Sequence, residues 1–227
     1  MRVILFGATG MIGQGVLREC LLDPRVTRVL SIGRASSGRK HEKLEDLVHA
    51  DLFDYSGIAE RLAGYDACFF CLGITSAGMS EAAYTRVTYN LSVAAGLALL
   101  RASPRLRLCF ISGAGADSSE TGRVMWARVK GRAENALLAM PFTQVTIFRP
   151  GIIEPLHGIT SRTASYRLLY ALLAPLVPVV HALAPAQITT TESIGRAMLQ
   201  VALAGSAKRV LTNADINAAA AALPAPG

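Results

Sequence analysis

A tryptophan and a lysine stand one helical turn apart in the segment WARVK, residues 126–130. Positions four residues apart lie on one face of a helix, so Trp126 and Lys130 would point the same way. An indole N–H only donates hydrogen bonds and does not titrate at usable pH. Lys130 could tune a catalytic acid, hold a cofactor or point into solvent. The choice depends on what the rest of the chain binds.

The elements that would position this pair are short apolar runs that alternate with longer helical patterns. Near-continuous apolar strands between helices are typical of a parallel sheet covered on both faces. The sequence therefore predicts an α/β fold with a doubly wound parallel sheet of the Rossmann type. Strands are expected at residues 2–6, 28–32, 44–49, 67–72, 107–112 and 144–149, and helices up to about Leu22, at about 80–101 and at about 123–139.

The pattern changes beyond Pro150. At 227 residues, 52% of them hydrophobic, the chain supports one sizeable core, and no repeat or linker divides it. We expect a single domain over residues 1–227, in which residues 151–227 contribute a small substrate lobe at the carboxyl edge of the sheet. The elements expected there are helices at about 165–182 and 190–204, a short strand near 209, a last helix and a frayed Ala/Pro-rich end at 217–227.

Glycines with the spacing G-x-x-G-x-x-G follow the first apolar run and open the first helix. In this context the first glycine permits a tight turn, the second lets the backbone approach a pyrophosphate, and the third lets helix and strand pack closely. The helix N-terminus adds free N–H groups and the positive end of its dipole. We therefore predict a dinucleotide phosphate site. The residues expected in it are Gly7, Thr9, Gly10, Met11, Ile12 and Gly13.

The segment SIGRASSGRK, at the end of the second expected strand, is basic. An NAD-specific site would place an acidic residue there, about 20 residues after the glycines, to bond the ribose 2′-hydroxyl. Arg34 stands in that position, with Arg39 and Lys40 close behind, so the loop offers cations to a 2′-phosphate. NADP(H) is therefore favoured as the cofactor, and NAD(H) is the alternative. After the third strand, Asp51 and Leu52 are placed to meet the adenine edge.

Charge, cysteines and hydropathy argue against other classes of protein. Lysine and arginine exceed the acidic residues by 23 to 16, but without a long run or interleaved aromatics, so nucleic-acid binding is not expected. Cys68 and Cys71 form a C-x-x-C, yet residues three apart on a strand face opposite sides, so no metal site is expected. Cysteine usage and the absence of a signal peptide predict a cytoplasmic location. The most apolar segment, 168–184, is shorter than the roughly 20 residues of a membrane span and contains prolines, so no integral membrane segment is expected.

These motifs together carry a family resemblance. The chain resembles the short-chain dehydrogenase/reductase superfamily over nearly its whole length. In detail it is similar to the atypical, epimerase/dehydratase-like branch near the Tat-interacting-protein oxidoreductases, through GVLREC, VKGRAE and RPG. The resemblance implies an NADP(H)-binding oxidoreductase. The matching positions are the Gly7–Gly13 segment, Arg34, Asp51, Leu52, Gly73, Asn90, Ser112, Lys130 and Arg149 to Gly151.

The resemblance also implies catalytic roles for Ser112, Trp126 and Lys130. Ser112, at the end of the fifth strand, would hold a substrate carbonyl oxygen. Lys130 would bond the nicotinamide ribose and lower the pKa of a catalytic tyrosine four residues before it. Trp126 occupies that tyrosine position, and an indole cannot pass a proton. The resemblance therefore implies an altered acid/base set.

Further contacts follow from the same resemblance. Gly73 would lie beside the cofactor, and Pro150 and Ile152 would meet the nicotinamide carboxamide. Asn90 would brace Lys130 through water, although an ordinary buried amide is an equal alternative. A homodimer through the apolar faces of the helices at 80–101 and 123–139 is a further expectation.

Three interpretations stay open, and the substrate is unknown in each. In the first, the protein reduces or oxidises a small carbonyl or alcohol, Trp126 or Ser112 bonds the carbonyl oxygen, and the proton comes from water or from Tyr84, Tyr89 or His157. In the second, it binds NADP(H) without turnover and acts as a redox-responsive interaction module. In the third, a pocket beside the nicotinamide holds an apolar ligand. The walls of that pocket would be Met125, Trp126, Tyr166 and residues 168–183.

Overall fold

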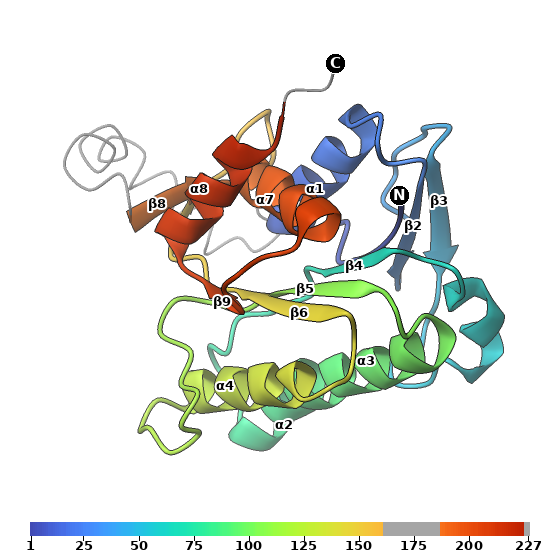
Figure 1. Ribbon diagram of the computed structural model, residues 1–227. Coiled ribbons are helices and arrows are strands. Elements are labelled where there is room, and N and C mark those ends of the chain that lie inside the picture. Colours follow the sequence, from blue (N-terminus) through green and yellow to red (C-terminus); the bar gives the residue numbers. More distant parts are fainter. Residues whose placement is uncertain (161–186, 225–227) are drawn as a thin grey trace.

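Seven parallel strands form the central sheet of the computed structural model, in the order β3-β2-β1-β4-β5-β6-β9 (Figure 1). The structure describes residues 1–160 and 187–224, so the helix expected at 165–182 lies outside the described residues. The strands of this sheet are β1 (Arg2–Phe6), β2 (Arg28–Gly33), β3 (Leu44–Val48), β4 (Ala67–Phe70), β5 (Arg107–Ile111), β6 (Gln144–Phe148) and β9 (Val210–Leu211).

Helices cover both faces of the sheet, which confirms the doubly wound prediction. Figure 1 shows α1, α7 and α8 on one face and α2, α3 and α4 on the other. The helix expected at about 80–101 contains a π-helical turn, η2, between α2 and α3, for which the sequence pattern has no signal. The helical elements are α1 (Met11–Leu22), the 3-10 helix η1 (Ser56–Leu62), α2 (Glu81–Thr85), η2 (Arg86–Asn90), α3 (Leu91–Ala102), α4 (Met125–Leu138), α7 (Thr191–Ala204) and α8 (Asn213–Ala222).

Strand side chains alternate between two apolar cores, one on each face. Val3 and Leu5 of β1 point into the core shared with α1 and α7, whereas Ile4 and Phe6 point into the core shared with α3 and α4. None of these four side chains has exposed surface. Burial on both faces explains why the strands read as continuous apolar runs.

The C-x-x-C pair divides between the same two cores. Cys68 lies in the core on the α3 and α4 side, and Cys71 lies in the core on the α1 side, as the strand geometry predicts. All cysteines are free and buried, and burial raises the pKa of both thiols well above their usual value. Among the described residues, no cluster of His, Cys, Asp and Glu side chains is suited to hold a metal ion.

The chain after residue 187 completes the main fold. A β-carbon on Gly15 would lie 2.6 Å from the carbonyl oxygen of Thr191, and one on Gly195 would lie 2.7 Å from Cγ of Glu19, so α1 and α7 pack in direct contact. β9 extends the sheet beside β6. The helix expected at 190–204 and the strand near 209 are therefore confirmed. A separate pair of parallel strands, β7 (Ile152–Glu154) and β8 (Ile188–Thr190), has no counterpart in the prediction.

The expectation of a frayed end is wrong for residues 217–224. α8 begins with a capping box in which Thr212 and Asp215 each accept a hydrogen bond from the other's backbone N–H. Leu223 is 3% exposed, and its carbonyl oxygen accepts from Arg196 at 2.7 Å. The alanines of this segment are good helix formers, and the helix has a buried side.

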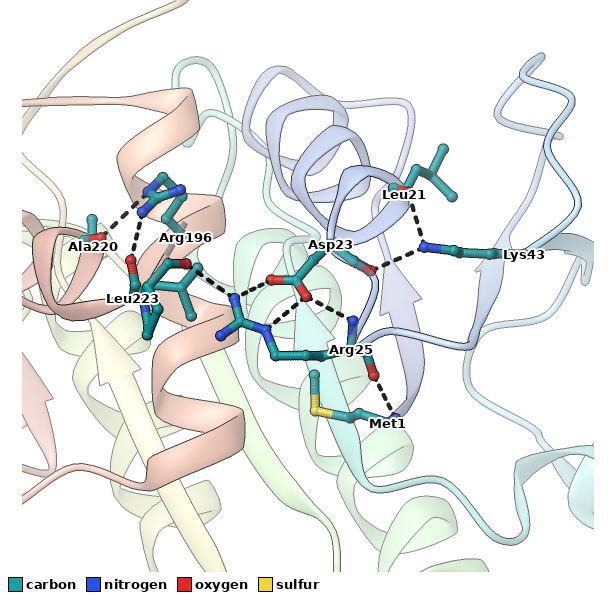
Figure 2. Close-up of polar contacts among 9 residues, drawn as sticks. Met1, Leu21, Asp23, Arg25, Lys43, Arg196, Ala220 and Leu223 are labelled. Atoms are coloured by element: carbon teal, nitrogen blue, oxygen red, sulfur yellow. Dashed lines mark hydrogen bonds and ion pairs between the residues drawn. The ribbon is translucent and has the colours of Figure 1, made fainter. Parts of the chain in front are cut away.

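A group of polar contacts joins the amino end of the sheet to this C-terminal segment (Figure 2). The Asp23 carboxylate accepts from Nε of Arg25 at 2.8 Å and from its backbone N–H at 2.9 Å. Arg25 also donates to the carbonyl oxygen of Pro224 at 3.3 Å and accepts from the Met1 amino group at 2.7 Å. Lys43 donates to the carbonyl oxygen of Asp23 at 3.0 Å. The end of α1, the start of β3 and the end of α8 are thus held together.

In the parts of the chain that the structure describes, no helix combines the length and the hydropathy that crossing a bilayer requires.

Candidate functional site

The order of the strands fixes where a ligand can approach the sheet. From β1 the chain adds β2 and then β3 on one side, and it returns to place β4 on the other side of β1. The direction of the strand order therefore reverses between β1 and β4. Open α/β sheets bind ligands at such a switch point. Gly7 follows β1 there with φ of +83°, a conformation that favours glycine. A β-carbon on Gly7 would lie 2.7 Å from the carbonyl carbon of Cys71, so the turn touches the end of β4.

The turn between β1 and α1 presents backbone amides. A β-carbon on Gly13 would lie 1.9 Å from the carbonyl oxygen of Gly7, so α1 packs on the turn only because this residue is glycine. Gly10 is the N-cap of α1 and makes no side-chain cap. The N–H groups of the first helical turn have no intrahelical partner and suit an anion. The half-buried residues of this turn are Thr9, Gly10, Met11 and Ile12.

The loop after β2 presents positive charge over a fixed support. Asp46 of β3 accepts through Oδ2 from the Ser36 hydroxyl at 2.7 Å and from the Ser37 backbone N–H at 3.1 Å, which holds the loop to the sheet. Asp46 was not predicted, because the dinucleotide-binding motif places an acidic residue after β2 and has no signal for one in β3. The basic side chains of the loop are exposed and form no ion pair with other described residues: Arg34, Arg39 and Lys40.

The two residues expected at the adenine edge differ in their surroundings. Leu52 is 4% exposed and packs in the core on the α3 and α4 side. Asp51 is exposed, and its Oδ1 accepts from the Phe53 backbone N–H at 2.9 Å, as in an Asx turn. Asp51 therefore shapes the turn, and Leu52 fixes it to the core.

Lys130 lies buried beside the carboxyl end of β5. Its Nζ donates to the carbonyl oxygen of Ile111 at 3.4 Å and lies 5.6 Å from the centre of the Phe110 ring. A β-carbon on Gly73 would lie 3.9 Å from the same nitrogen, so the segment after β4 also meets it. Burial lowers the pKa of Lys130 to about 8, although the charge of Glu134 acts in the opposite direction.

Ser112 follows Ile111 at the same strand end and is 8% exposed. Its backbone N–H donates to the carbonyl oxygen of Phe148 at 2.8 Å, which fixes it beside β6. Its Oγ is buried and has no hydrogen-bond partner among the described residues. A buried polar group without a partner costs about 1–3 kcal/mol. A ligand that bonds this hydroxyl would remove that cost.

Trp126 covers the glycine loop after β5. A β-carbon on Gly115 would lie 3.4 Å from Cη2 of the indole, and one on Gly113 would lie 4.0 Å from Cζ3. The indole is half-buried and shares a face of α4 with Lys130. Trp126 therefore forms a wall of the site and brings no titratable proton to it.

A buried ion pair ties α4 to the end of β6. Nε of Arg149 donates to the two carboxylate oxygens of Glu134 at 3.0 and 3.1 Å, and another guanidinium nitrogen donates to the Ser118 hydroxyl at 2.6 Å. Glu134 has no exposed surface. Removing one partner of such a pair costs about 3–5 kcal/mol. The RPG motif singled out Arg149, but sequence reasoning missed Glu134, whose helical pattern resembles that of any solvent-facing acid.

The segment after β6 is held by α8. Pro150 is buried, and its carbonyl oxygen accepts from the Ala114 backbone N–H at 2.9 Å. The Gly151 backbone N–H donates to Oδ1 of Asn213 at 2.9 Å. Ile152, in β7, is 47% exposed. Sequence reasoning missed Asn213 because it stands 62 residues away and belongs to no motif.

The other candidate proton donors lie on elements other than α4 and β5. The Arg132 guanidinium lies 4.4 Å from the centre of the half-buried Tyr89 ring, and His157 pairs with Glu192 at the start of α7. Tyr84 is buried in α2.

Two smaller expectations have different outcomes. Asn90 is exposed, which is at odds with the buried amide expected as an alternative for it. Of the walls expected for an apolar pocket, Met125 and Trp126 are half-buried, whereas Tyr166 and residues 168–183 lie outside the described residues.

The strand order and the glycine turn at its switch point define a Rossmann-type dinucleotide-binding protein. The model of the NAD(P)H-binding family matches residues 7–164. The chain belongs to this family, and the predicted resemblance is confirmed.

Known proteins with similar sequences include fungal proteins and a mammalian one. The chain is 30% identical to "Protein FMP52-2, mitochondrial" of Scheffersomyces stipitis, in an alignment that covers 66% of this chain and 65% of that protein. It is 27% identical to "Protein HTATIP2" of Rattus norvegicus, over 66% of this chain and 62% of that protein. The chain thus spans just under two thirds of the length of these relatives.

The fold also resembles that of solved enzymes. The crystal structure of DesIV, a dTDP-glucose 4,6-dehydratase of Streptomyces venezuelae with NAD and TYD bound, has a TM-score of 0.67 and 17% sequence identity. The alignment covers 93% of this chain and 75% of that enzyme. This likeness supports the Rossmann-type fold.

Proposed function

We propose that this protein is an NADP(H)-dependent oxidoreductase that acts on a small carbonyl or alcohol substrate. The observation that carries the proposal is that two sets of groups share one edge of the sheet. The amide-lined turn follows β1, and the buried Lys130 and Ser112 lie at the end of β5, two strands away. When bound, the nicotinamide ring supplies hydride transfer.

The turn after β1 would hold the diphosphate through the free amides at the start of α1. Leu52 and Asp51 would border the adenine ring. Arg34, together with the other basic side chains of its loop, would bond a 2′-phosphate, since the loop offers donors to an anion and Oδ2 of Asp46 already accepts from Ser36 and Ser37. This charge pattern favours NADP(H) over NAD(H).

At the other end of the site, Lys130 would bond the nicotinamide ribose, and the backbone at Pro150 and Ile152 would border the carboxamide. The orphaned Ser112 hydroxyl would hold the substrate oxygen. Trp126, at the position where the superfamily has its tyrosine, closes one side of the substrate space. Its indole excludes water from the reacting groups, which strengthens the electrostatic interactions within the site.

Two titrations test this function. Purified protein is titrated with NADPH and with NADH, and binding is followed by the fluorescence of the reduced nicotinamide. We expect NADPH to bind at least about tenfold more tightly, as one additional charge-assisted contact allows. NADPH oxidation is then measured against a panel of aldehydes and ketones. If neither coenzyme binds, the proposed function is wrong.

The lack of a titratable group in Trp126 favours one second candidate. In it, the protein binds NADP(H) without turnover and works as a redox-responsive interaction module. NADPH binding with no oxidation across the panel, together with a partner whose binding differs between the reduced and oxidised coenzyme, would support this candidate. A cytoplasmic location and a homodimer through the helices at 80–101 and 123–139 remain proposals, to be tested by cell fractionation and by sedimentation.

A further inference from the structure

Lys130 and Ser112 form the polar centre of the site. Lys130 is 9% exposed, and its Nζ donates to the carbonyl oxygen of Ile111 at a long 3.4 Å. Ser112 is the next residue along the chain, and its buried Oγ has no partner among the described residues. The ammonium and the hydroxyl therefore lie at one strand end with hydrogen-bonding capacity to spare, because an ammonium has three donors.

The elements packed around Nζ bring little charge to it. Gly73, from the segment after β4, and the Phe110 ring, from β5, have no titratable group. On α4 itself, Glu134 is the charged group that acts on the ammonium, and the Arg149 guanidinium from the end of β6 already binds that carboxylate. Burial consequently dominates and lowers the pKa of Lys130 to about 8.

We propose that Lys130 is the general acid of the carbonyl reduction, in place of the tyrosine that position 126 lacks. The inference rests on the proposed function. The substrate carbonyl carbon accepts a hydride, with its electron pair, from a dihydronicotinamide, and the π electrons of the C=O bond move to oxygen. That oxygen, held by the Ser112 hydroxyl, takes a proton from the Lys130 ammonium. The products are an alcohol, an oxidised nicotinamide and a neutral amine, which recovers a proton from water.

The chemistry of the neighbouring groups supports this assignment. Trp126 shares a face of α4 with Lys130 but cannot release a proton at usable pH. His157 pairs with Glu192 at the start of α7, and Tyr89 belongs to the π-helical turn η2, with its ring beside the Arg132 guanidinium. A general acid works best when its pKa lies near the working pH, which a buried lysine meets and a solvated lysine does not.

The first test needs no cofactor. The chain has four lysines, at positions 40, 43, 130 and 208, so the Cε signals of protein labelled with ¹³C-lysine can be resolved by NMR. The Lys130→Arg variant assigns the Lys130 signal by its loss. We expect this signal to titrate with a midpoint near 8, compared with about 10.4 for a free lysine side chain. A midpoint near the free value would overturn the proposal, whether or not NADPH binds.

The second test separates proton donation from binding. Arginine keeps the positive charge and hydrogen-bond donors of lysine but cannot be deprotonated in proteins. We expect Lys130→Arg to lower kcat by about 10²- to 10⁴-fold, with NADPH affinity changed only several-fold. Lys208→Arg is the matched control, because Lys208 is exposed and pairs with Asp215 far from the site. Thermal unfolding of both variants verifies that they fold.

The outcomes distinguish the two proposals. If NADPH does not bind, the proposed function fails, and the reaction assigned to Lys130 fails with it. If NADPH binds and carbonyls are reduced but Lys130→Arg retains the rate, only the role of Lys130 is wrong. Binding without reduction of any carbonyl in the panel also overturns that role. A Lys130 midpoint near 8, together with a selective loss of kcat in Lys130→Arg, supports it.

Discussion

Gly131 packs directly against the backbone of Asp117. A β-carbon on Gly131 would lie 1.7 Å from the carbonyl oxygen of Asp117, and the Asp117 backbone N–H donates to the carbonyl oxygen of Ala127 at 3.0 Å. Helix α4 and the loop after β5 therefore meet backbone to backbone. Because Lys130 directly precedes Gly131, this contact also sets how closely its ammonium approaches the end of β5.

Replacing Gly131 by alanine should force α4 away from this loop. Overpacking a tight contact costs about 1–3 kcal/mol, and we expect the upper end because backbone is the obstacle. Urea unfolding measures the change. Gly57→Ala is the matched control, because a β-carbon there would meet no side chain or backbone from other parts of the chain within 4 Å. Similar losses in the two variants would show that the Gly131 contact has no special role.

Two glycines of the β1 turn should respond differently to alanine. A β-carbon on Gly13 would overlap the Gly7 carbonyl oxygen at 1.9 Å, whereas one on Gly10 would lie 3.4 Å from it. We expect Gly13→Ala to lower the free energy of unfolding by about 1–3 kcal/mol. Gly10→Ala should leave stability within about 1 kcal/mol of the parent protein, since its conformation suits alanine.

The same pair of variants reports on the cofactor. Gly10→Ala adds a methyl group where the backbone is expected to meet a pyrophosphate, so NADPH affinity should fall at least about tenfold. Fluorescence titration gives this value beside the unfolding data. Unchanged NADPH affinity in a folded Gly10→Ala protein would mean that no pyrophosphate approaches this turn.

Arg34→Asp should reverse the charge that meets a 2′-phosphate. We expect NADPH affinity to fall by at least about tenfold, since a hydrogen bond to a charged group contributes about 1.5–3 kcal/mol, while NADH affinity should hold or rise. Arg105→Asp is the control, because Arg105 is exposed at the opposite edge of the sheet, before β5. If the ratio of the two affinities is the same in Arg34→Asp and the parent protein, Arg34 does not select the coenzyme.

Local patterns made most of the fold predictable. Strands buried on both faces appear as continuous apolar runs, and a glycine triplet between such a run and a helix has few structural meanings. β7 and β8 have three residues each, too few for a periodic pattern, and were not predicted. Residues 217–224 were expected to fray because composition alone does not show that Leu223 reaches the core.

The parts of the site that escaped prediction depend on contacts between distant residues. Glu134 differs from other helical acids only in its ion pair with Arg149, 15 residues later. Asn213 stands out only because it accepts from the backbone N–H of Gly151, 62 residues earlier. Gly131 did carry a local signal, because a glycine inside a helix is costly and indicates a close approach. The assignments of Ser112, Trp126 and Lys130 remain predictions, although the structure places Ser112 and Lys130 at one strand end.

Asp23 should stabilise the junction of Figure 2 most at neutral pH. Hydrogen bonds from Arg25 lower the pKa of the Asp23 carboxyl in the folded protein. The stabilisation that this carboxylate gives is therefore fully present above its unfolded pKa, about 3.9, and is lost as pH falls through its lower folded pKa. Asp23→Asn should lower the free energy of unfolding by about 1–3 kcal/mol at pH 7. Chemical unfolding across pH 2–7 checks this, with the exposed Glu60→Gln as control. If the difference in unfolding free energy between Asp23→Asn and the parent protein widened toward low pH, the lowered pKa of Asp23 would be contradicted.

Glu19 should show the opposite dependence. It lies between α1 and α7 and is 7% exposed, and burial raises its pKa, although its hydrogen bond with Arg18 partly offsets this. A folded pKa above the unfolded value of about 4.3 means that the native state holds the proton longer, so stability is lost as pH rises through the folded value. Glu19→Gln cannot ionise and escapes this loss.

We therefore expect Glu19→Gln to gain stability relative to the parent protein as pH rises from 4 toward 8. Urea unfolding at several pH values measures the difference, and Glu42→Gln, at an exposed position, should show no such trend. If Glu19→Gln instead becomes less stable relative to the parent protein as pH rises, the ion pair with Arg18 outweighs the cost of burying the carboxylate. The contact between α1 and α7 would then be stabilised by the charge of Glu19 and not despite it.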